Sequence, residues 1–153
     1  MRKGMLLCLI CILLLPFAAA CGSAANKEFM LSLKLHRMDE IKQLLSQKSI
    51  SVKETEMMES YRLSGADESV AYRLDDEGRE LLYIYVFGSP EEMSLGVRAL
   101  EEQTALIDIV YLPYIYTANN ALIIHMRSLA PGTDEVSDIE KLASELGWKR
   151  PEK

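Results

Sequence analysis

Seven consecutive residues from Leu81 to Phe87 are large and apolar, and five of them are β-branched or aromatic residues of the types enriched in strands. No charged or small polar residue alternates with them, so a strand over this stretch has two apolar faces. Strands of this kind lie in the middle of a sheet that is covered, at least in part, on both sides. The sequence therefore predicts a central strand from Glu80 to Phe87.

A turn signal comes just before this strand. Residues 75–78 read Asp-Asp-Glu-Gly, which are typical turn residues. Residues 69–74 alternate between apolar and polar side chains, which indicates another strand. Two strands joined by a short Asp/Gly turn predict a hairpin. A first strand is predicted to begin at residues 50–53, with a continuation as far as Glu56 left open.

Two more strands are predicted after the middle of the chain, over residues 106–116 and 121–126. Asn119 and Asn120 separate them, and asparagine is a turn residue because it tolerates positive φ. Pro113 has no N–H to donate to a sheet, so it indicates an edge strand or a bulge.

Three helices are predicted by periodicity and by capping patterns. Residues 28–47 place apolar side chains on one face at steps of three and four. Ser89-Pro90-Glu91-Glu92 is a capping box with proline at the first helical position. A second capping box begins at Ser137, and Gly147 is the expected stop of that helix.

The predicted order of elements is α-β-β-β-α-β-β-α. Runs of strands joined by tight turns indicate an antiparallel sheet, and the helices must bury their apolar stripes on it. We therefore expect the α+β class, as a two-layer sandwich of about five strands and three helices.

Residues 1–20 have the parts of a secretory signal peptide: Arg2 and Lys3, then an uncharged apolar run, then small residues. A membrane-spanning helix is the alternative. The apolar stretch is shorter than the roughly 17–25 residues that spanning requires, and Pro16 interrupts it.

Residues 19–23 read Ala-Ala-Cys-Gly-Ser and resemble the lipobox of bacterial lipoproteins. The resemblance implies that Cys21 becomes the first residue of the mature chain and carries diacylglyceryl and palmitate groups. Ala18 departs from the family, which usually has leucine at that position. Ala18-x-Ala20 also suits the ordinary signal peptidase, which would leave Cys21 as a free thiol. In layout the chain resembles small extracytoplasmic lipoproteins of Gram-positive bacteria that have no assigned activity.

The predicted mature chain consists of the lipidated cysteine with a short tether, residues 21–27, and one domain, residues 28–150. Cys8 and Cys11 leave with the signal, so Cys21 has no partner for an intramolecular disulfide. The domain must be stabilised by its own hydrophobic core.

Charge is unevenly distributed along the chain. Residues 27–53 contain six basic and three acidic residues, whereas residues 54–153 contain nine basic and twenty acidic residues. Such an acidic body argues against nucleic acid as a partner. The basic segment next to the anchor is expected either to be ordinary solvated surface or to face anionic lipid.

No pattern of catalytic, metal-binding or cofactor-binding residues is found in the sequence. The two histidines, His36 and His125, show none of the spacings of zinc sites. His36 is expected on the polar side of the first helix. His125 is expected in the last strand, as a packed or surface residue, and it is the first place to look for a dispersed site.

Tyrosines are the least ordinary feature, because six of the seven lie in predicted strands. Tyr83 and Tyr85 share one face of a strand, as do Tyr114 and Tyr116. Tyrosine is common in strands and also at interfaces. The four tyrosines are therefore a candidate interaction face for a protein, a glycan or an apolar ligand.

The expected function is that of a lipoprotein on the extracytoplasmic face of the cell membrane, acting as a non-catalytic binding or interaction module. The expected partners are the membrane, through the lipid anchor, and a protein or glycan of the cell envelope. The alternative is a small envelope enzyme or a ligand-carrying domain with a dispersed site near His125. A concave pocket that brings His125 and a carboxylate together would favour that alternative.

Overall fold

The computed structural model describes residues 34–105, 111–128 and 137–151. Five antiparallel strands form one sheet: β1 (Lys53–Thr55), β2 (Glu68–Arg73), β3 (Glu80–Val86), β4 (Tyr111–Ala118) and β5 (Ala121–Ser128). The strand order is β1-β2-β3-β5-β4, so β3 is central and β4 is an edge. The helices are α3 (Met38–Gln47), α4 (Pro90–Thr104) and α5 (Asp138–Glu145), with a short 3₁₀ turn, η2 (Glu59–Tyr61).

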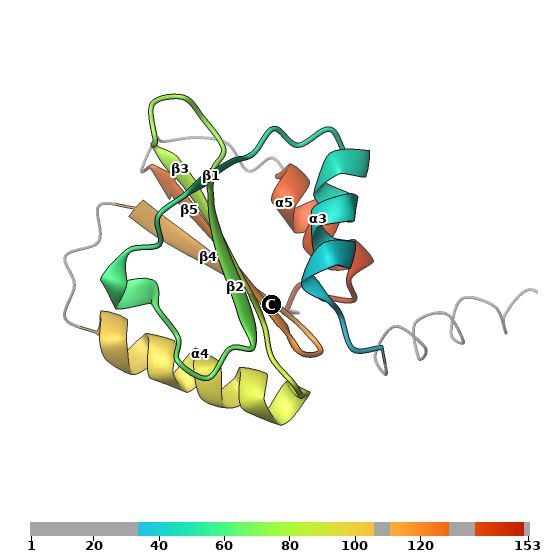
Figure 1. Cartoon of the computed structure of the whole chain (residues 1–153), viewed down its shortest axis with the longest axis vertical. Coiled ribbons are helices and arrows are strands. Elements are labelled where there is room, and N and C mark those ends of the chain that lie inside the picture. Colours follow the sequence, from blue (N-terminus) through green and yellow to red (C-terminus); the bar gives the residue numbers. More distant parts are fainter. Residues whose placement is uncertain (1–33, 106–110, 129–136, 152–153) are drawn as a thin grey trace, which may run out of the picture. The chain divides into compact units, whose positions relative to one another are not determined.

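The α+β class, the antiparallel sheet and the order of elements are confirmed. The layering differs from the expected two-layer sandwich, because helices cover both faces of the sheet (Figure 1). Helices α3 and α5 pack on one face, whereas α4 and η2 pack on the other. The structure therefore has three layers.

Strand β3 explains the third layer. Leu82 and Ile84 belong to the core beneath α3 and α5, whereas Tyr83 and Tyr85 belong to the core beneath α4. All four side chains are fully buried. A strand that is apolar on both faces is stable only when both faces are covered. The sequence predicted that both faces of this strand are covered. The expected two-layer sandwich was inconsistent with that prediction, because it places helices on one face of the sheet only.

The first helix begins later than predicted. Residues 34–37 are not helical, and α3 starts only at Met38, after Arg37 with the extended angles φ −118° and ψ 152°. The apolar periodicity predicted too early a start for this helix. Leu35, which the pattern assigns to the buried face, is half exposed in the structure. Residues 28–33 of the predicted helix lie outside the described residues.

The first strand also lies later than predicted, at Lys53–Thr55. The chain leaves α3 through Ser49, which has φ 56°, and Ile50 and Val52 then pack against the core. Apolar Ile50 and Val52 alternate with polar residues as in a strand, but hydrogen-bonded pairing with β2 begins only at Lys53.

The predicted caps and turns are confirmed. Ser89 Oγ accepts a hydrogen bond from the N–H of Glu92, and Ser137 Oγ accepts one from the N–H of Glu140, each at 3.1 Å. Asn119 has φ 53° in the β4–β5 turn, and Gly147 has φ 103° after α5. Pro113 lies in edge strand β4. Residues 106–110, where this strand was expected to start, lie outside the described residues.

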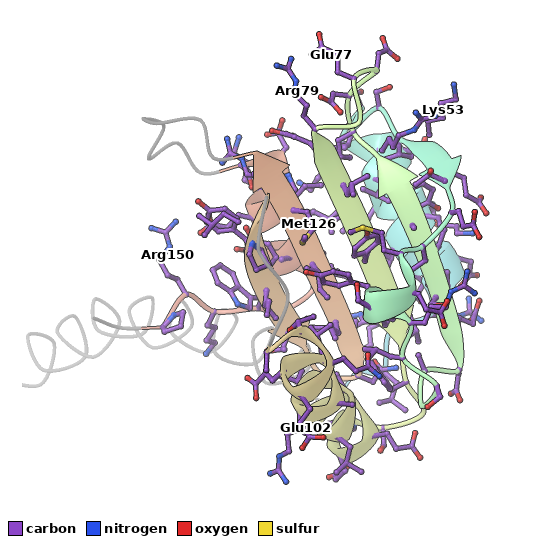
Figure 2. The ribbon with its side chains drawn as sticks, turned by 90° about the vertical axis from the view of Figure 1, so that its left-hand side faces the viewer. Lys53, Glu77, Arg79, Glu102, Met126 and Arg150 are labelled. Carbon is purple, nitrogen blue, oxygen red and sulfur yellow. The ribbon has the colours of Figure 1, made fainter. Side chains whose placement is uncertain are left out.

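The hairpin of β2 and β3 ends in the predicted turn. Gly78 has φ 68° there, a conformation that glycine adopts without steric cost. Figure 2 shows Glu77 and Arg79 together at the tip of this hairpin, where their side chains form an ion pair of 2.5 Å. Both side chains are exposed, so the pair contributes little to stability.

Candidate functional site

A pocket of about 260 Å³ lies at the end of the sheet where β3 begins and β5 ends. The segment after α3 and the N-terminus of α5 form its other walls. Its polar side chains come from four elements or their flanks: Ser49, Ser51, Glu80, His125, Arg127, Ser137 and Asp138. The histidine and a carboxylate from a neighbouring strand thus line one concave pocket.

Strand register brings the three central residues together. Glu80 of β3 pairs with Arg127 of β5, and Leu82 pairs with His125. Residues directly opposite each other in an antiparallel pair point to the same face of the sheet, as do residues two apart in a strand. Glu80, His125 and Arg127 therefore all face the α5 side.

Glu80 lies between the other two side chains. Its Oε2 is 3.5 Å from His125 Nε2, and its Oε1 is 3.7 Å from Arg127 Nε. The ion pair with Arg127 is partly buried, whereas His125 is only 2% exposed. Within the described part of the chain, neither Nδ1 nor Nε2 of His125 has a hydrogen-bond partner, although Nε2 lies within ion-pair distance of Glu80. A buried polar atom of this kind is costly unless a ligand or water satisfies it.

Burial lowers the pKa of His125, because water cannot solvate the charged imidazolium. The carboxylate of Glu80 acts in the opposite direction but does not cancel this effect, and Arg127 adds to it. The imidazole is therefore neutral at pH 7. A neutral imidazole has one donor and one acceptor nitrogen, so it can hydrogen-bond a ligand in either sense or accept a proton.

The α5 side of the pocket has fewer free groups. Ser137 Oγ is used as the helix cap. Asp138 accepts a 2.8 Å hydrogen bond from Lys141 Nζ, and this contact lowers the pKa of Asp138. The carboxylate of Asp138 is thus already compensated within its own helix.

A second and larger pocket, of about 540 Å³, lies on the opposite face between β1, η2 and the end of α4. Its charged lining includes Arg62, which is paired with Glu56 and Glu59 and is about half exposed. None of the described titratable side chains that line it is buried. Of these two pockets we therefore regard the His125 pocket as the candidate site, because its described lining includes a buried, incompletely hydrogen-bonded group beside a carboxylate.

The predicted tyrosine face is not formed. Tyr83 and Tyr85 point towards α4, whereas Tyr116 packs in the core on the other side and makes an edge contact with Trp148. All three are buried, and Tyr85 donates a hydrogen bond to the carbonyl of Tyr61. Only Tyr114 of the four is exposed, at 40%. The strand alternation was correct, but the tyrosines fill the two cores instead of lining one surface.

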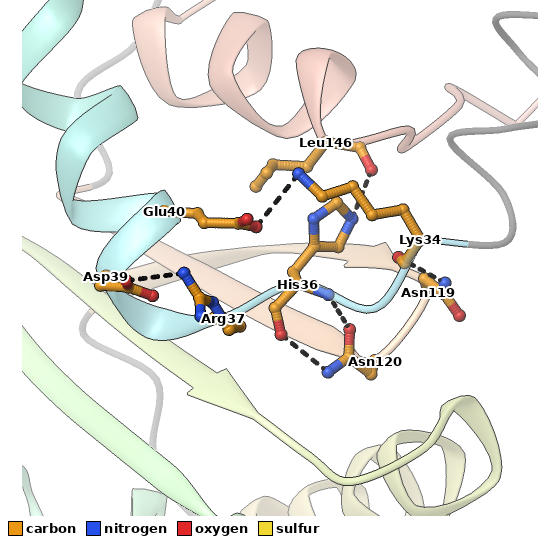
Figure 3. Close-up of polar contacts among 8 residues, drawn as sticks. All are labelled: Lys34, His36, Arg37, Asp39, Glu40, Asn119, Asn120 and Leu146. Carbon is orange, nitrogen blue, oxygen red and sulfur yellow. Dashed lines mark hydrogen bonds and ion pairs between the residues drawn. The ribbon is translucent and has the colours of Figure 1, made fainter.

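His36 also differs from expectation. It lies before α3 rather than on its polar side, and it is buried. Its backbone N–H and C=O are both hydrogen-bonded to the side chain of Asn120, and its Nε2 lies 2.8 Å from the carbonyl of Leu146 (Figure 3). These contacts indicate a structural role for His36.

Sequence reasoning singled out His125 but missed Glu80 and Arg127. These two residues are 47 positions apart in the sequence, and they meet because β5 pairs with β3 rather than only with β4. Local patterns predicted both strands but not their adjacency, so no signal in the sequence linked the two residues.

Cys21, the signal and the tether lie outside the described residues. Among the described helices, none is both long and apolar enough to cross a membrane. The described residues also contain no cluster of three or more histidine, cysteine or acidic side chains suited to a metal ion. No family model, curated protein or solved structure matches the chain.

Proposed function

We propose that the chain is a lipoprotein, anchored through Cys21 on the extracytoplasmic face of the membrane, that acts as a non-catalytic binding module. The observation that carries the binding role is the His125 pocket, where a buried ring nitrogen without a partner among the described residues lies beside the Glu80–Arg127 pair. Pockets with a few convergent polar groups are typical ligand sites. The anchoring role rests on the lipobox-like residues 19–23.

The position of the pocket relative to the anchored end supports this role. The described chain starts at Lys34, beside the β4–β5 turn, where Asn119 donates a hydrogen bond to the Lys34 carbonyl. The pocket lies at the opposite end of β5, because Arg127 is six residues from Ala121. Six strand residues span about 20 Å. A domain anchored from the Lys34 end therefore has its binding site well separated from the anchored end.

Two of the basic residues near the anchor have acidic partners. Lys34 pairs with Glu40 at 3.1 Å, and Arg37 pairs with Asp39 at 3.0 Å. Their partners offset the positive charge of these two side chains. In this proposal the covalent lipid supplies most of the membrane affinity.

Mass spectrometry of the mature N-terminus tests the anchor. The full chain is expressed in a bacterium with lipoprotein-processing enzymes, and its N-terminal peptide is expected to begin at Cys21 with added diacylglyceryl mass. Cys21→Ala is expected to remove the protein from the detergent phase of a phase-separation assay. The double variant Cys8→Ala/Cys11→Ala is the control and is expected to stay there. An unmodified Cys21 thiol would disprove the anchor.

The pocket also brings His125 and the Glu80 carboxylate together, which is the arrangement expected of the alternative function, proton transfer to or from a bound substrate. His125 Nε2 lies 3.5 Å from Glu80 Oε2, and such a pair of titratable groups can exchange a proton with a substrate. Nuclear magnetic resonance of a bound ligand over time separates the two functions. Conversion of the ligand by the wild-type chain, lost in His125→Asn, would establish catalysis, whereas an unchanged ligand supports simple binding.

A further inference from the structure

The charges that line the His125 pocket compensate one another. Glu80 is paired with Arg127, and Asp138 is paired with Lys141. Burial keeps His125 neutral. The described wall therefore offers little net charge to an ionic ligand, but it offers carboxylate acceptors, guanidinium donors and serine hydroxyl groups at close quarters. A neutral ligand that carries both donors and acceptors satisfies such a wall best.

An exposed aromatic ring lies next to two residues of the pocket wall. Tyr114 of edge strand β4 lies directly opposite His125 in the strand register, and the two ring centroids are 6.4 Å apart. The Arg127 guanidinium lies 5.9 Å from the centre of the Tyr114 ring. The Tyr114 side chain thus joins a flat apolar surface to the polar pocket on the same face of the sheet.

The size of the pocket restricts the ligand. Its volume of about 260 Å³ is slightly below the roughly 300–1,000 Å³ of typical small-molecule sites. A single ring-sized unit fits, and Tyr114 offers a surface for the next part of a longer molecule. Purely apolar molecules are disfavoured, because they would desolvate the Glu80 carboxylate and leave the His125 ring nitrogens without hydrogen bonds.

We propose that the pocket binds one ring of a neutral, hydroxyl-rich saccharide, and that Tyr114 stacks against the next part of the chain. Glu80 accepts hydrogen bonds from sugar hydroxyl groups, and Arg127 donates to ring or hydroxyl oxygens. The C–H face of the sugar lies against the tyrosine ring. This proposal rests on the binding role proposed above and adds the chemical class of the ligand.

Binding of soluble saccharides to the full-length lipidated chain in detergent micelles tests this assignment. The panel contains the neutral disaccharides maltose, cellobiose and diacetylchitobiose, together with digalacturonate as an acidic counterpart, measured by saturation-transfer resonance and calorimetry. At least one neutral sugar is expected to bind with a Kd of about 1 mM or tighter, and the acidic sugar at least tenfold more weakly.

Three variants of residues in or beside the pocket locate the site and leave the His125 side chain itself unchanged. Glu80→Gln and Tyr114→Ala are each expected to weaken sugar binding about tenfold, and Ser51→Trp is expected to abolish it by filling the pocket. Leu95→Ala, on the exposed side of α4, is the matched control and is expected to change nothing. Circular dichroism establishes that each variant is folded.

Two results would overturn the saccharide assignment. One is the absence of saturable binding by every neutral sugar of the panel, and the other is sugar binding that all three pocket variants leave unchanged. Either result is distinct from failure of the anchor, because the N-terminal mass of Cys21 is measured separately. Tighter binding of digalacturonate than of the neutral sugars would likewise disprove the neutral class.

Discussion

The side-chain amide of Asn120 is hydrogen-bonded to both backbone groups of His36, 84 residues away in the sequence. Its Oδ1 accepts from the His36 N–H at 2.6 Å, and its Nδ2 donates to the His36 carbonyl at 3.0 Å. The same Nδ2 donates to the Phe87 carbonyl at 2.7 Å. One buried amide therefore joins the start of the domain to the β4–β5 turn and to the end of β3.

Asn120→Ala is expected to lower the free energy of unfolding by about 3 kcal/mol, because three buried backbone groups lose their partner. Urea denaturation measures the loss. Asn119→Gly is the control. Glycine suits φ 53° and only one exposed hydrogen bond is lost, so a change below about 1 kcal/mol is expected. Equal losses in the two variants would contradict the role of the buried amide.

Gly96→Ala is expected to destabilise the protein although alanine favours helices. A Cβ at Gly96 would lie 2.4 Å from Cζ of Phe87, a fully buried ring. The resulting strain of about 1–3 kcal/mol exceeds the propensity gain of about 1 kcal/mol. Gly65→Ala is the matched control, because no atom lies within 4 Å of its added Cβ. Thermal unfolding of both variants should show a lower Tm for Gly96→Ala alone.

Stability is expected to fall as the pH drops below about 6.5. Burial lowers the pKa of both His36 and His125 from the usual 6.5, so the unfolded chain binds protons more readily than the folded chain. Nearby Lys34 and Arg127 act in the same direction, whereas Glu40 and Glu80 oppose it. Urea midpoints measured between pH 5 and 8 should rise with pH and level off above 7. His125→Gln should reduce the slope, and a flat profile in the wild type would contradict the assignment.

Tyr114 is expected to react before the buried tyrosines in brief nitration with tetranitromethane. Its side chain is 40% exposed, whereas Tyr83, Tyr85 and Tyr116 are buried. Burial also raises the pKa of Tyr85 and Tyr116, which disfavours the reactive phenolate. Peptide mass spectrometry identifies the modified residue. All four should react in urea, and early modification of Tyr83 in the folded chain would argue against the observed layering.

Much of the fold follows from local sequence signals. The capping serines, the Asp/Gly hairpin turn and the position of Pro113 are all as predicted, because each depends on residues within a few positions of one another. The start of α3 was predicted wrongly for the opposite reason. The non-helical conformation at His36 is stabilised by Asn120, and a pattern confined to residues 28–47 contains no information about that partner.

The candidate site was only partly accessible to sequence reasoning. The sequence indicates His125 as a candidate site residue if a carboxylate lies beside it. Which carboxylate lies there depends on strand pairing, and local sequence patterns do not predict that pairing. The tyrosine face failed because alternation shows which residues share a face and not whether a helix covers it. Tyr83 and Tyr85 lie beneath α4, whose apolar stripe required just such a surface.

The attachment of His36 to Asn120 also has a mechanical consequence. Any tension transmitted along the chain from its N-terminal side enters the described domain at Lys34 and reaches the His36–Asn120 hydrogen bonds before it reaches the sheet. These hydrogen bonds lie at the end of β5 opposite Arg127. If they break under tension, the segment that detaches first is therefore the entry segment at His36, at the far end of the sheet from the pocket.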